Sequence, residues 1–555
     1  MLLLTVYGGQ AHLRSDSLMR AIASSQLSRT AGVKAQYVKS PQQLHCVLDK
    51  EALAVYEPTQ SDGFVVVARN DEVEPVLAYG TGRFEPDALP ENVKWWLASV
   101  QQRLSATDVE VPRRNVRFTP VENFITTIWG QDAPFNKLTP RQAPCGCVAT
   151  ALAQAMNYRK HPASAQFEEE YYVITDTVIA YSAQVNSTYS WNYADSYVGA
   201  SPRHGNAVAQ LLADCGYATC MQYAASGSGT YNFMAARALT YYFDYPEESV
   251  KSLSRAYAPD EEFFQIIYDE LAEQSPVIFG GSDENFGGHS FVLSGVDDDG
   301  LVWVNWGWDG EYNGYYAIDL MNSPNGYFTD GQDVVYGIRT TLLPTDHIEG
   351  RICMYGSTPY SFTYEPYVSL DEDINVEKCI QIALPRGIIN ENATDMVGQL
   401  GLFGTDLTDG QAWVVAETDR DTIYCASGFV GNGLMFYYDV SDLQTEHTYR
   451  MSFGVRDDRD SQWRSIRCKG GEIAYDVTVH ADGTATISEA IYKGTASDIT
   501  PLSSGQFGRA KHTDVYDLQG RLVYTAPTAQ FNLSDVPIHG TLIVRQGDKV
   551  RKVLK

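Results

Sequence analysis

The pattern of hydrophobic and polar positions changes along the chain and predicts helices only in the first part. Two short apolar runs between residues 54 and 68 predict strands, and residues 91–104 have the mixed pattern of an amphipathic helix. The stretch 148–156 consists mainly of alanine and other good helix formers, and the His161-Pro162 pair predicts its end. The first part of the chain is therefore expected to be α+β.

Strand patterns dominate the later part of the chain. Residues 287–296 form an apolar run that opens with glycine, an acidic turn lies at 297–300, and residues 301–308 form a second run. This order predicts a β-hairpin. Beyond residue 350, short β-like runs such as 412–416 and 451–455 alternate with polar turns, a pattern typical of an all-β sandwich.

A chain of 555 residues exceeds one ordinary domain, and 44% hydrophobic with 20% charged residues indicates globular protein. The patterns predict four parts, at residues 1–114, 115–345, 346–492 and 493–555. The formal charge of −28 repels phosphates, so nucleic acid is excluded as a partner. No apolar run approaches the roughly 20 residues of a membrane span.

The first residues, Leu2–Val6, have the composition of a signal-peptide apolar region but lack the basic residues that precede one. They are expected to be either the remnant of an export signal or a packed strand.

Nine cysteines are spread widely and form neither a dense disulfide pattern nor paired CxxC motifs. No metal or other cofactor is therefore expected, and most of these residues are expected to be small buried side chains. Cys147 differs because it stands at the start of the predicted helix 148–156. Free backbone N–H groups and the helix dipole stabilise a thiolate there, which is the nucleophilic form. A buried structural cysteine remains the alternative.

The predicted hairpin carries His289 and, sixteen residues later, Asn305. Neighbouring strands bring these two side chains to one end of the hairpin, where an amide could orient an imidazole that acts as a general base. Gln131, upstream of the cysteine, could donate a hydrogen bond to an oxyanion. The alternatives are a core histidine, a loop glutamine and, for Asp297–Asp299, a plain turn rather than a calcium loop.

The order Gln, Cys, His, Asn is that of papain-like cysteine peptidases. The strings WGQDAPFN, GCVATALAQAMNYRKHP and GGHSFVLSGVDDDGLVWVNWGWDG resemble those of the streptopain (interpain) family, across roughly residues 120–340. The resemblance implies a papain-like domain and a role for each matching position. These roles are nucleophile for Cys147, general base for His289, histidine orienter for Asn305, oxyanion donor for Gln131 and a cover over the His–Asn bond for Trp306.

One position departs from the family pattern. Cys145 stands two residues before the nucleophile, where the family usually has a small residue. The match of Cys147 to the helix start favours Cys147 as the nucleophile, and Cys145 is expected to be either an inert neighbour or one half of a disulfide.

Residues 63–84 resemble the family's inhibitory propeptide domain, and the basic stretch 112–117 offers processing sites. The mature N-terminus is predicted between Arg114 and Pro120. A permanent small α+β domain is the alternative. Residues 514–523 and the basic end from 540 onward resemble the sorting module of the type IX secretion system. This implies outer-membrane export in a Bacteroidetes-type bacterium to the medium or the cell surface, although adhesive β modules share these features.

Together these features predict a zymogen of an exported cysteine endopeptidase. Protein or peptide substrates would be hydrolysed through a Cys147–His289 thiolate–imidazolium pair and a thioester acyl-enzyme. The propeptide would be its own inhibitor and the type IX machinery its export partner. Two alternatives remain, an adhesin that uses the peptidase fold for binding, and acyl transfer to an amine in place of water.

Overall fold

The computed structural model describes residues 13–30, 40–105, 118–192, 202–283, 287–321, 331–346 and, with interruptions, 352–554. The predicted signal remnant at Leu2–Val6 and the processing stretch 112–117 lie outside these residues. The chain divides into two compact units, one of residues up to Asp346 apart from 256–259, and one that begins at His347 and includes 256–259.

The first unit opens with a small α+β layer. Helix α1 (Asp16–Arg29) begins at Ser15, whose hydroxyl accepts the N–H of Leu18 at 3.3 Å and caps the helix. It covers an antiparallel sheet whose strands are β1 (Leu44–Asp49), β2 (Leu53–Pro58), β3 (Phe64–Ala68) and β4 (Val76–Gly80). Strands β2 and β3 are buried along their whole length, which agrees with their mainly apolar sequence, and the exception is the buried Glu57 of β2.

The sheet does not end at β4. It continues through strands that come from much later in the chain, and the ten strands have the order β1-β2-β3-β4-β12-β11-β10-β9-β13-β8. The later strands are β8 (Lys251–Ser254), β9 (Val277–Asp283), β10 (Gly287–Val296), β11 (Val302–Asn305), β12 (Gly314–Tyr316) and β13 (Asp333–Tyr336). The small N-terminal layer and the part predicted to carry the chemistry therefore share one sheet.

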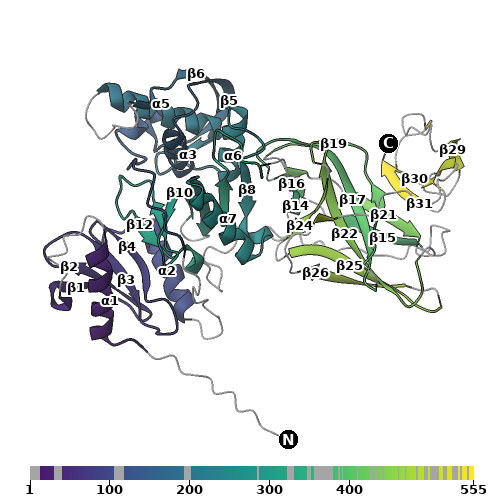
Figure 1. Cartoon of the computed structure of the whole chain (residues 1–555). Coiled ribbons are helices and arrows are strands. Elements are labelled where there is room, and N and C mark those ends of the chain that lie inside the picture. The colour runs from purple at the N-terminus through teal and green to yellow at the C-terminus, as the bar shows by residue number, and fades with distance from the viewer. Residues whose placement is uncertain are drawn as a thin grey trace, which may run out of the picture. The chain divides into compact units, whose positions relative to one another are not determined.

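Helices flank this sheet in the first unit (Figure 1). They are α2 (Glu91–Ser105), α3 (Cys147–Arg159), α5 (Pro202–Ala218), α6 (Asn232–Tyr241) and α7 (Asp260–Ala272), with short 3-10 turns at Pro41–Gln43, Phe135–Leu138, Pro140–Gln142, Arg255–Tyr257 and Ile318–Leu320. A separate three-stranded sheet, β6-β5-β7, contains β5 (Ser164–Ile174), β6 (Val178–Thr188) and β7 (Gln222–Tyr223). Figure 1 shows α3 beside β10, and the two elements are in contact.

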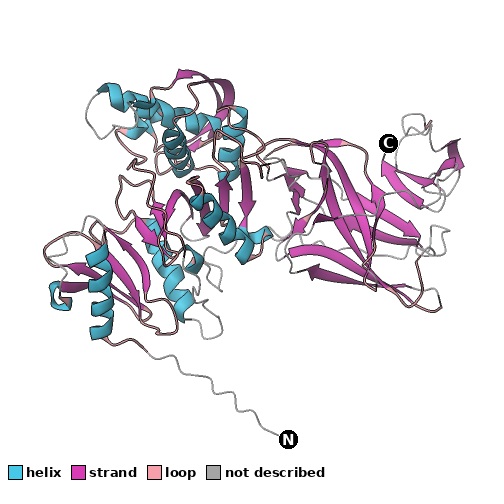
Figure 2. Cartoon of the chain, in the orientation of Figure 1, coloured by secondary structure: helices cyan, strands magenta, loops and turns pink. Residues whose placement is uncertain are grey.

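In the second unit, the described residues from 352 onward form strands and no helix, as the magenta arrows of Figure 2 show. A twelve-stranded sheet contains β14 (Ile352–Met354), β16 (Ile388–Asn390), β17 (Met396–Asp406), β18 (Ala412–Glu417), β19 (Asp421–Ile423), β20 (Gly428–Phe429), β22 (Thr448–Asp457), β23 (Trp463–Ser465), β24 (Arg467–Cys468), β25 (Gly471–Val479), β26 (Ala485–Tyr492) and β27 (Asp498–Ile499). A six-stranded sheet contains β15 (Cys379–Leu384), β21 (Leu434–Asp439), β28 (His512–Tyr516), β29 (Leu522–Pro527), β30 (Thr541–Gln546) and β31 (Lys549–Leu554).

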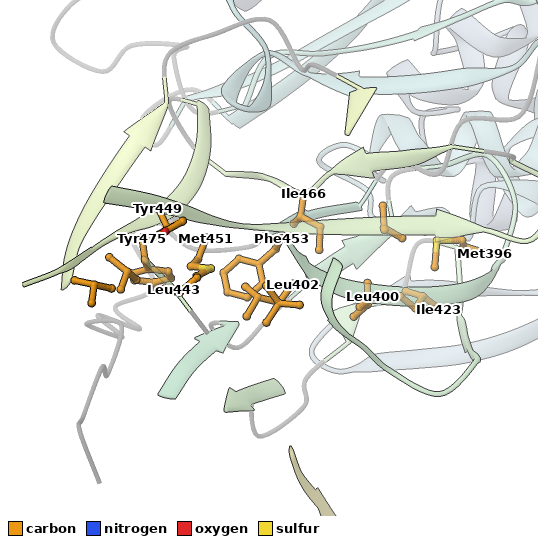
Figure 3. Close-up of a cluster of buried hydrophobic side chains, with 14 residues drawn as sticks. Met396, Leu400, Leu402, Ile423, Leu443, Tyr449, Met451, Phe453, Ile466 and Tyr475 are labelled. Atoms are coloured by element: carbon orange, nitrogen blue, oxygen red, sulfur yellow. The ribbon is translucent and has the colours of Figure 1, made fainter. Parts of the chain in front are cut away.

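The core of the second unit comes from inward-facing side chains of its long strands. Leu402 of β17, Phe453 of β22 and Tyr475 of β25 are buried and belong to one cluster (Figure 3). The two sheets and this core confirm the all-β prediction for the C-terminal half. The fold class as a whole is α+β followed by β. The four-part division at residues 114, 345 and 492 stays a prediction.

One predicted element is shorter than expected. The run 301–308 forms a strand only over Val302–Asn305. Gly307 has a φ of +73°, which is outside the β region, so the chain leaves the sheet before Trp308. The turn before this strand is a plain one, because the Asp297 carboxylate accepts the N–H groups of Asp299 and Leu301.

No helix among the described residues is long and apolar enough to cross a membrane. The described residues also contain no group of three or more His, Cys, Asp and Glu side chains arranged to hold a metal ion.

Candidate active site

Cys147 is the first residue of α3, as the sequence predicts. The preceding residue, Gly146, has a φ of +89°, and a Cβ at that position would lie 2.6 Å from the Met221 sulfur. Glycine is therefore required there for both its backbone conformation and its lack of a side chain. The turn that it makes places the Cys147 thiol at the helix end where backbone N–H groups have no partner within the helix.

The environment of the Cys147 thiol acts on its pKa in two directions. Burial raises the pKa of Cys147 above its ordinary value, and the backbone N–H groups of Ser290, Val148 and Cys147 itself oppose this rise. Ser290 follows His289 on β10, so α3 and β10 bring the thiol next to the strand that carries the histidine. In this arrangement the thiol is protonated at neutral pH.

The His289 ring is held by a backbone carbonyl. Its Nε2 lies 2.9 Å from the carbonyl oxygen of Trp306. Since a carbonyl oxygen can only accept a hydrogen bond, this contact requires the proton on Nε2. Nδ1 is then the nitrogen with the free lone pair, which is the state that a general base needs.

Aromatic rings surround the imidazole. The ring centres of Phe291, Trp306 and Trp308 lie 6.1, 6.5 and 5.8 Å from that of His289. The Trp308 Nε1 lies 3.3 Å from Nε2, and because an indole N–H can only donate, this longer contact competes with the Trp306 carbonyl at 2.9 Å and is not a hydrogen bond when Nε2 carries the proton. Burial among these rings lowers the pKa of His289 to about 4, against a smaller opposite effect of the Trp306 carbonyl. The imidazole is therefore neutral at pH 7.

Among the contacts of the described residues, none joins the Cys147 thiol to the His289 ring. With a raised pKa on the cysteine and a lowered pKa on the histidine, both groups are uncharged. The thiolate–imidazolium pair stays a prediction for another arrangement of the same residues.

Asn305 lies where the sequence predicts but contacts other groups. Its Nδ2 donates to the Thr127 carbonyl oxygen at 2.7 Å and to the Gln154 Oε1 at 3.0 Å, and its Oδ1 accepts the Gly307 N–H at 3.1 Å. The side chain is completely buried. In this structure its polar atoms are already bonded and the neighbouring Trp306 carbonyl holds the His289 ring instead. The orienting role of the Asn305 amide stays a prediction for another arrangement.

Gln131 is buried beside the nucleophile. Its backbone oxygen accepts the Cys145 N–H at 2.9 Å, which fixes residue 131 against the turn that leads to Cys147. The residue before it, Gly130, lies against the Asp309 carboxylate, where a Cβ would be 2.6 Å from an oxygen. The oxyanion role of the Gln131 side chain stays a prediction.

The two neighbouring thiols differ in environment. Cys145 is fully buried, and burial followed by the nearby Asp132 raises the pKa of its thiol far above the ordinary value. Cys147 keeps part of its surface exposed, and both thiols are free. Of the two residues, only Cys147 keeps surface accessible to a substrate in this structure, so the geometry favours Cys147 over Cys145.

Trp306 is buried against the sheet. Its ring lies 4.7 Å from Phe291 and 5.2 Å from Tyr316, and Tyr316 in turn lies 4.9 Å from Trp96 of α2. The Trp96 Nε1 donates to the Ala317 carbonyl oxygen at 3.3 Å. A continuous line of aromatic contacts therefore joins the N-terminal layer to the residue whose carbonyl holds His289.

Sequence reasoning missed three contributors, namely Gln154, Trp308 and the Trp96–Tyr316 contact. Gln154 carried a readable signal, because it and Thr150 are the only polar residues in the run 148–156. Trp308 stands within the same motif as Trp306. The Trp96–Tyr316 contact joins positions 220 residues apart, and no local pattern indicates it.

Comparisons with known proteins identify the families that this chain matches. Residues 129–316 match the Peptidase C10 family and residues 20–104 match the Spi protease inhibitor family. The chain is 33% identical over 339 residues to the thiol protease/hemagglutinin PrtT of Porphyromonas gingivalis, an alignment that covers 54% of this chain and 39% of that relative. It is 26% identical to streptopain of Streptococcus pyogenes over 384 residues, which covers 60% of this chain and 94% of streptopain.

A solved structure of a prointerpain A fragment from Prevotella intermedia is 33% identical, with a TM-score of 0.48, and the match covers 54% of this chain and 99% of the fragment. The chain spans 39% of the length of the first of the curated relatives.

Proposed function

Because this chain belongs to the peptidase C10 family of cysteine-type peptidases and carries a Spi-type inhibitor domain, we propose that it is the zymogen of an exported endopeptidase that hydrolyses proteins or peptides. The observation that carries the proposal is the position of the Cys147 thiol at the start of α3, against the backbone N–H of the residue that follows His289.

Each step of the proposed reaction uses a group already at this site. His289 Nδ1 takes the thiol proton, and the Cys147 sulfur attacks the carbonyl carbon of the scissile peptide bond. The Cys147 N–H and the Gln131 amide donate to the oxyanion. The imidazolium then protonates the leaving amine and a thioester forms. Water, deprotonated by the same imidazole, cleaves the thioester and releases the acid and the thiol.

The uncharged Cys147 and His289 of this structure would be the resting state of the zymogen. In that state the domain at residues 20–104 would act as an inhibitor. Strand β4 pairs with β12, with Tyr79 opposite Tyr315 and Gly80 opposite Gly314. Trp96 packs on Tyr316, which packs on Trp306. We propose that release of residues 1–114 frees this layer, so that His289 moves from its uncharged position into an ion pair with Cys147. Asn305 would orient the imidazole in that second state, and Trp306 would shield the bond.

The proposal includes export. Strands β28 to β31 join β21 and β15 in the six-stranded sheet, and the last strand carries the basic residues Lys549 and Lys552. Together with the sorting-module resemblance, this supports a C-terminal signal for type IX secretion and a secreted or surface location. Deletion of residues 493–555 should retain the protein inside the cell envelope, and fractionation of the host checks this.

Hydrolysis of casein by the processed protein with reductant tests the peptidase. Wild type should cleave, Cys147→Ala should not, and Cys145→Ala should retain activity. Retention of activity in Cys147→Ala would refute the assignment of the nucleophile. If folded, processed wild type cleaved neither casein nor a peptide library, the adhesin alternative would replace the peptidase. Transfer to an added amine in preference to water would replace hydrolysis by acyl transfer.

A further inference from the structure

We propose that Gln154 is a positioning residue of the active site, which acts through Asn305 to place residues 305–307. This segment holds His289 by the Trp306 carbonyl in this structure and carries the orienting Asn305 amide in the proposed active state. This inference rests on the proposed peptidase function, and no motif of the sequence assigns a role to Gln154. The residue lies on α3, is completely buried and carries an uncharged amide.

The Gln154 amide bonds to segments outside its own helix. Its Oε1 accepts the Thr127 hydroxyl at 2.8 Å, the Asn305 Nδ2 at 3.0 Å and, more weakly, the Trp129 N–H at 3.4 Å. Its Nε2 donates to the Asn305 Oδ1 at 3.4 Å. Gln154 and Asn305 therefore form a reciprocal amide pair, which fixes the orientation of both side chains.

These bonds join α3, which carries Cys147, to two other segments of the candidate site. Residues 127–129 lead into Gln131. Residues 305–307 carry the Trp306 carbonyl, and the Asn305 Oδ1 accepts the Gly307 N–H on its far side. The carbonyl that holds His289 thus lies between two residues that are both tied, directly or through Asn305, to Gln154.

The helix geometry relates this amide to the nucleophile. Gln154 follows Cys147 by seven residues, which is close to two full turns, so both side chains lie on the same stripe of α3 and about 10 Å apart along its axis. The Cys147 end of this stripe meets β10 at Ser290, and the Gln154 end meets β11 at Asn305. The helix therefore contacts both strands at fixed points, and its length sets the distance from the thiol to the loop that holds the histidine.

A role in packing alone explains fewer of these observations than a positioning role does. A buried amide costs free energy unless it is fully hydrogen-bonded, and leucine or methionine would fill this helix position without that requirement. The partners of Gln154 all lie in segments that bear proposed active-site groups. A cavity of about 110 Å³ borders the amide, lined by residues that include Thr127, Asn157 and Lys160. This space leaves room for a substituted side chain to adjust.

The test compares two apolar replacements in processed enzyme. Gln154→Met removes the amide at nearly constant volume. Asn157→Leu removes a buried amide one turn further along α3, whose oxygen accepts Lys160 Nζ at 3.3 Å, so it is the matched control. We expect kcat to fall about 10- to 100-fold in Gln154→Met with KM within about threefold, because the imidazole is displaced from its working position. Asn157→Leu should keep kcat within about threefold.

The pH profile separates positioning from packing. A hydrogen-bond acceptor on residues 305–307 favours the imidazolium, namely the Trp306 carbonyl in this structure and the Asn305 amide oxygen in the proposed active state. Loosening this segment therefore lowers the pKa of His289. In Gln154→Met, the basic limb of the kcat/KM profile should therefore move to lower pH, while Asn157→Leu leaves it in place. Gln154→Glu keeps an oxygen for the same donors and should recover part of kcat. Combining Gln154→Met with Asn305→Leu should cost no more than the larger single effect.

Three outcomes overturn the inference. These are a wild-type kcat and basic limb in Gln154→Met, an equal loss of kcat in Asn157→Leu, and additive losses in the double variant. If Gln154→Met does not fold, Thr127→Val removes one donor to the same Gln154 oxygen. This variant should show a smaller shift of the basic limb in the same direction. An unshifted basic limb in Thr127→Val also overturns the inference. The pH dependence of iodoacetamide alkylation of Cys147 gives the same comparison without substrate, so failure of the peptidase proposal is recognised separately.

Discussion

The two sides of the candidate site are built by different means. On the cysteine side, the start of α3 and a φ of +89° at Gly146 place the thiol, and the contacts from elsewhere in the chain are those of Ser290 with the thiol and of Met221 with Gly146. On the histidine side, the ring is held by the Trp306 carbonyl and by aromatic contacts that extend to Trp96 in the inhibitor-like layer. The position of the Cys147 thiol therefore depends mainly on neighbouring residues in the sequence. In the proposed mechanism, the protonation state of His289 depends on the distant N-terminal domain.

The largest expected effect on activity concerns the cysteine side of the site. Cys147→Ala should lower kcat/KM by more than about 1,000-fold, because the attacking atom is removed. Cys145→Ala should stay within about threefold of wild type, since its buried, protonated thiol does not reach the substrate. Casein and peptide assays on the processed protein check both. A large loss in Cys145→Ala alone would reverse the assignment of the two thiols.

The next largest effect concerns the histidine side of the site and its contact with the N-terminal domain. Trp96→Ala removes a buried ring that packs on Tyr316 and should weaken attachment of the N-terminal domain by about 3–5 kcal/mol. The separated domain should then inhibit the processed enzyme at least about 100-fold less well. Trp95→Ala, in the same helix, is the control. Equal losses of inhibition in the two variants would contradict the role given to the Trp96–Tyr316 contact.

A smaller effect is expected at the helix start. Gly146→Ala places a Cβ against Met221 at a φ that alanine rarely adopts, so the turn before Cys147 must shift. We expect kcat to fall about tenfold, because a displaced nucleophile reacts more slowly. Gly229→Ala, with open space around its Cβ, should leave activity unchanged. Steady-state kinetics check the pair, and an unchanged kcat in Gly146→Ala would show that the turn tolerates a side chain.

The smallest effect is expected at Trp308. Trp308→Phe keeps an aromatic ring beside His289 but removes the indole N–H that lies 3.3 Å from Nε2. Because the Nε2 proton already has an acceptor, the Trp306 carbonyl in this structure and the Asn305 amide oxygen in the proposed active state, we expect less than about a fivefold change in kcat/KM. A loss as large as that of Gln154→Met would mean that the indole, and not the carbonyl, holds the ring.

The sequence predicted the parts of the site that are coded locally. The alanine-rich run after Cys147 and the hairpin around His289 both form, because helix propensity and strand alternation act over a few residues. Gln131 and Asn305 are proposed from residue type and position, and the resemblance to the streptopain family adds Trp306; the roles of all three stay predictions.

The remaining features depend on contacts that no local pattern contains. The partner of His289 is a backbone oxygen, which carries no residue identity, and the partners of Asn305 depend on which face of β11 α3 covers. The strand ends at Asn305 because Gly307 leaves the β region, although the apolar pattern continues to Trp308. The shared sheet of β4 and β12 joins residues more than 200 positions apart.

Alkylation of Cys147 by iodoacetamide as a function of pH, before and after removal of residues 1–114, tests the central claim most directly. The intact chain should react slowly at neutral pH and accelerate only at alkaline pH, because burial raises the pKa of the thiol and the histidine is uncharged. The processed chain should show an added reactive phase near neutral pH from the ion pair. Identical profiles in the two forms would contradict the claim that the N-terminal domain controls the state of His289.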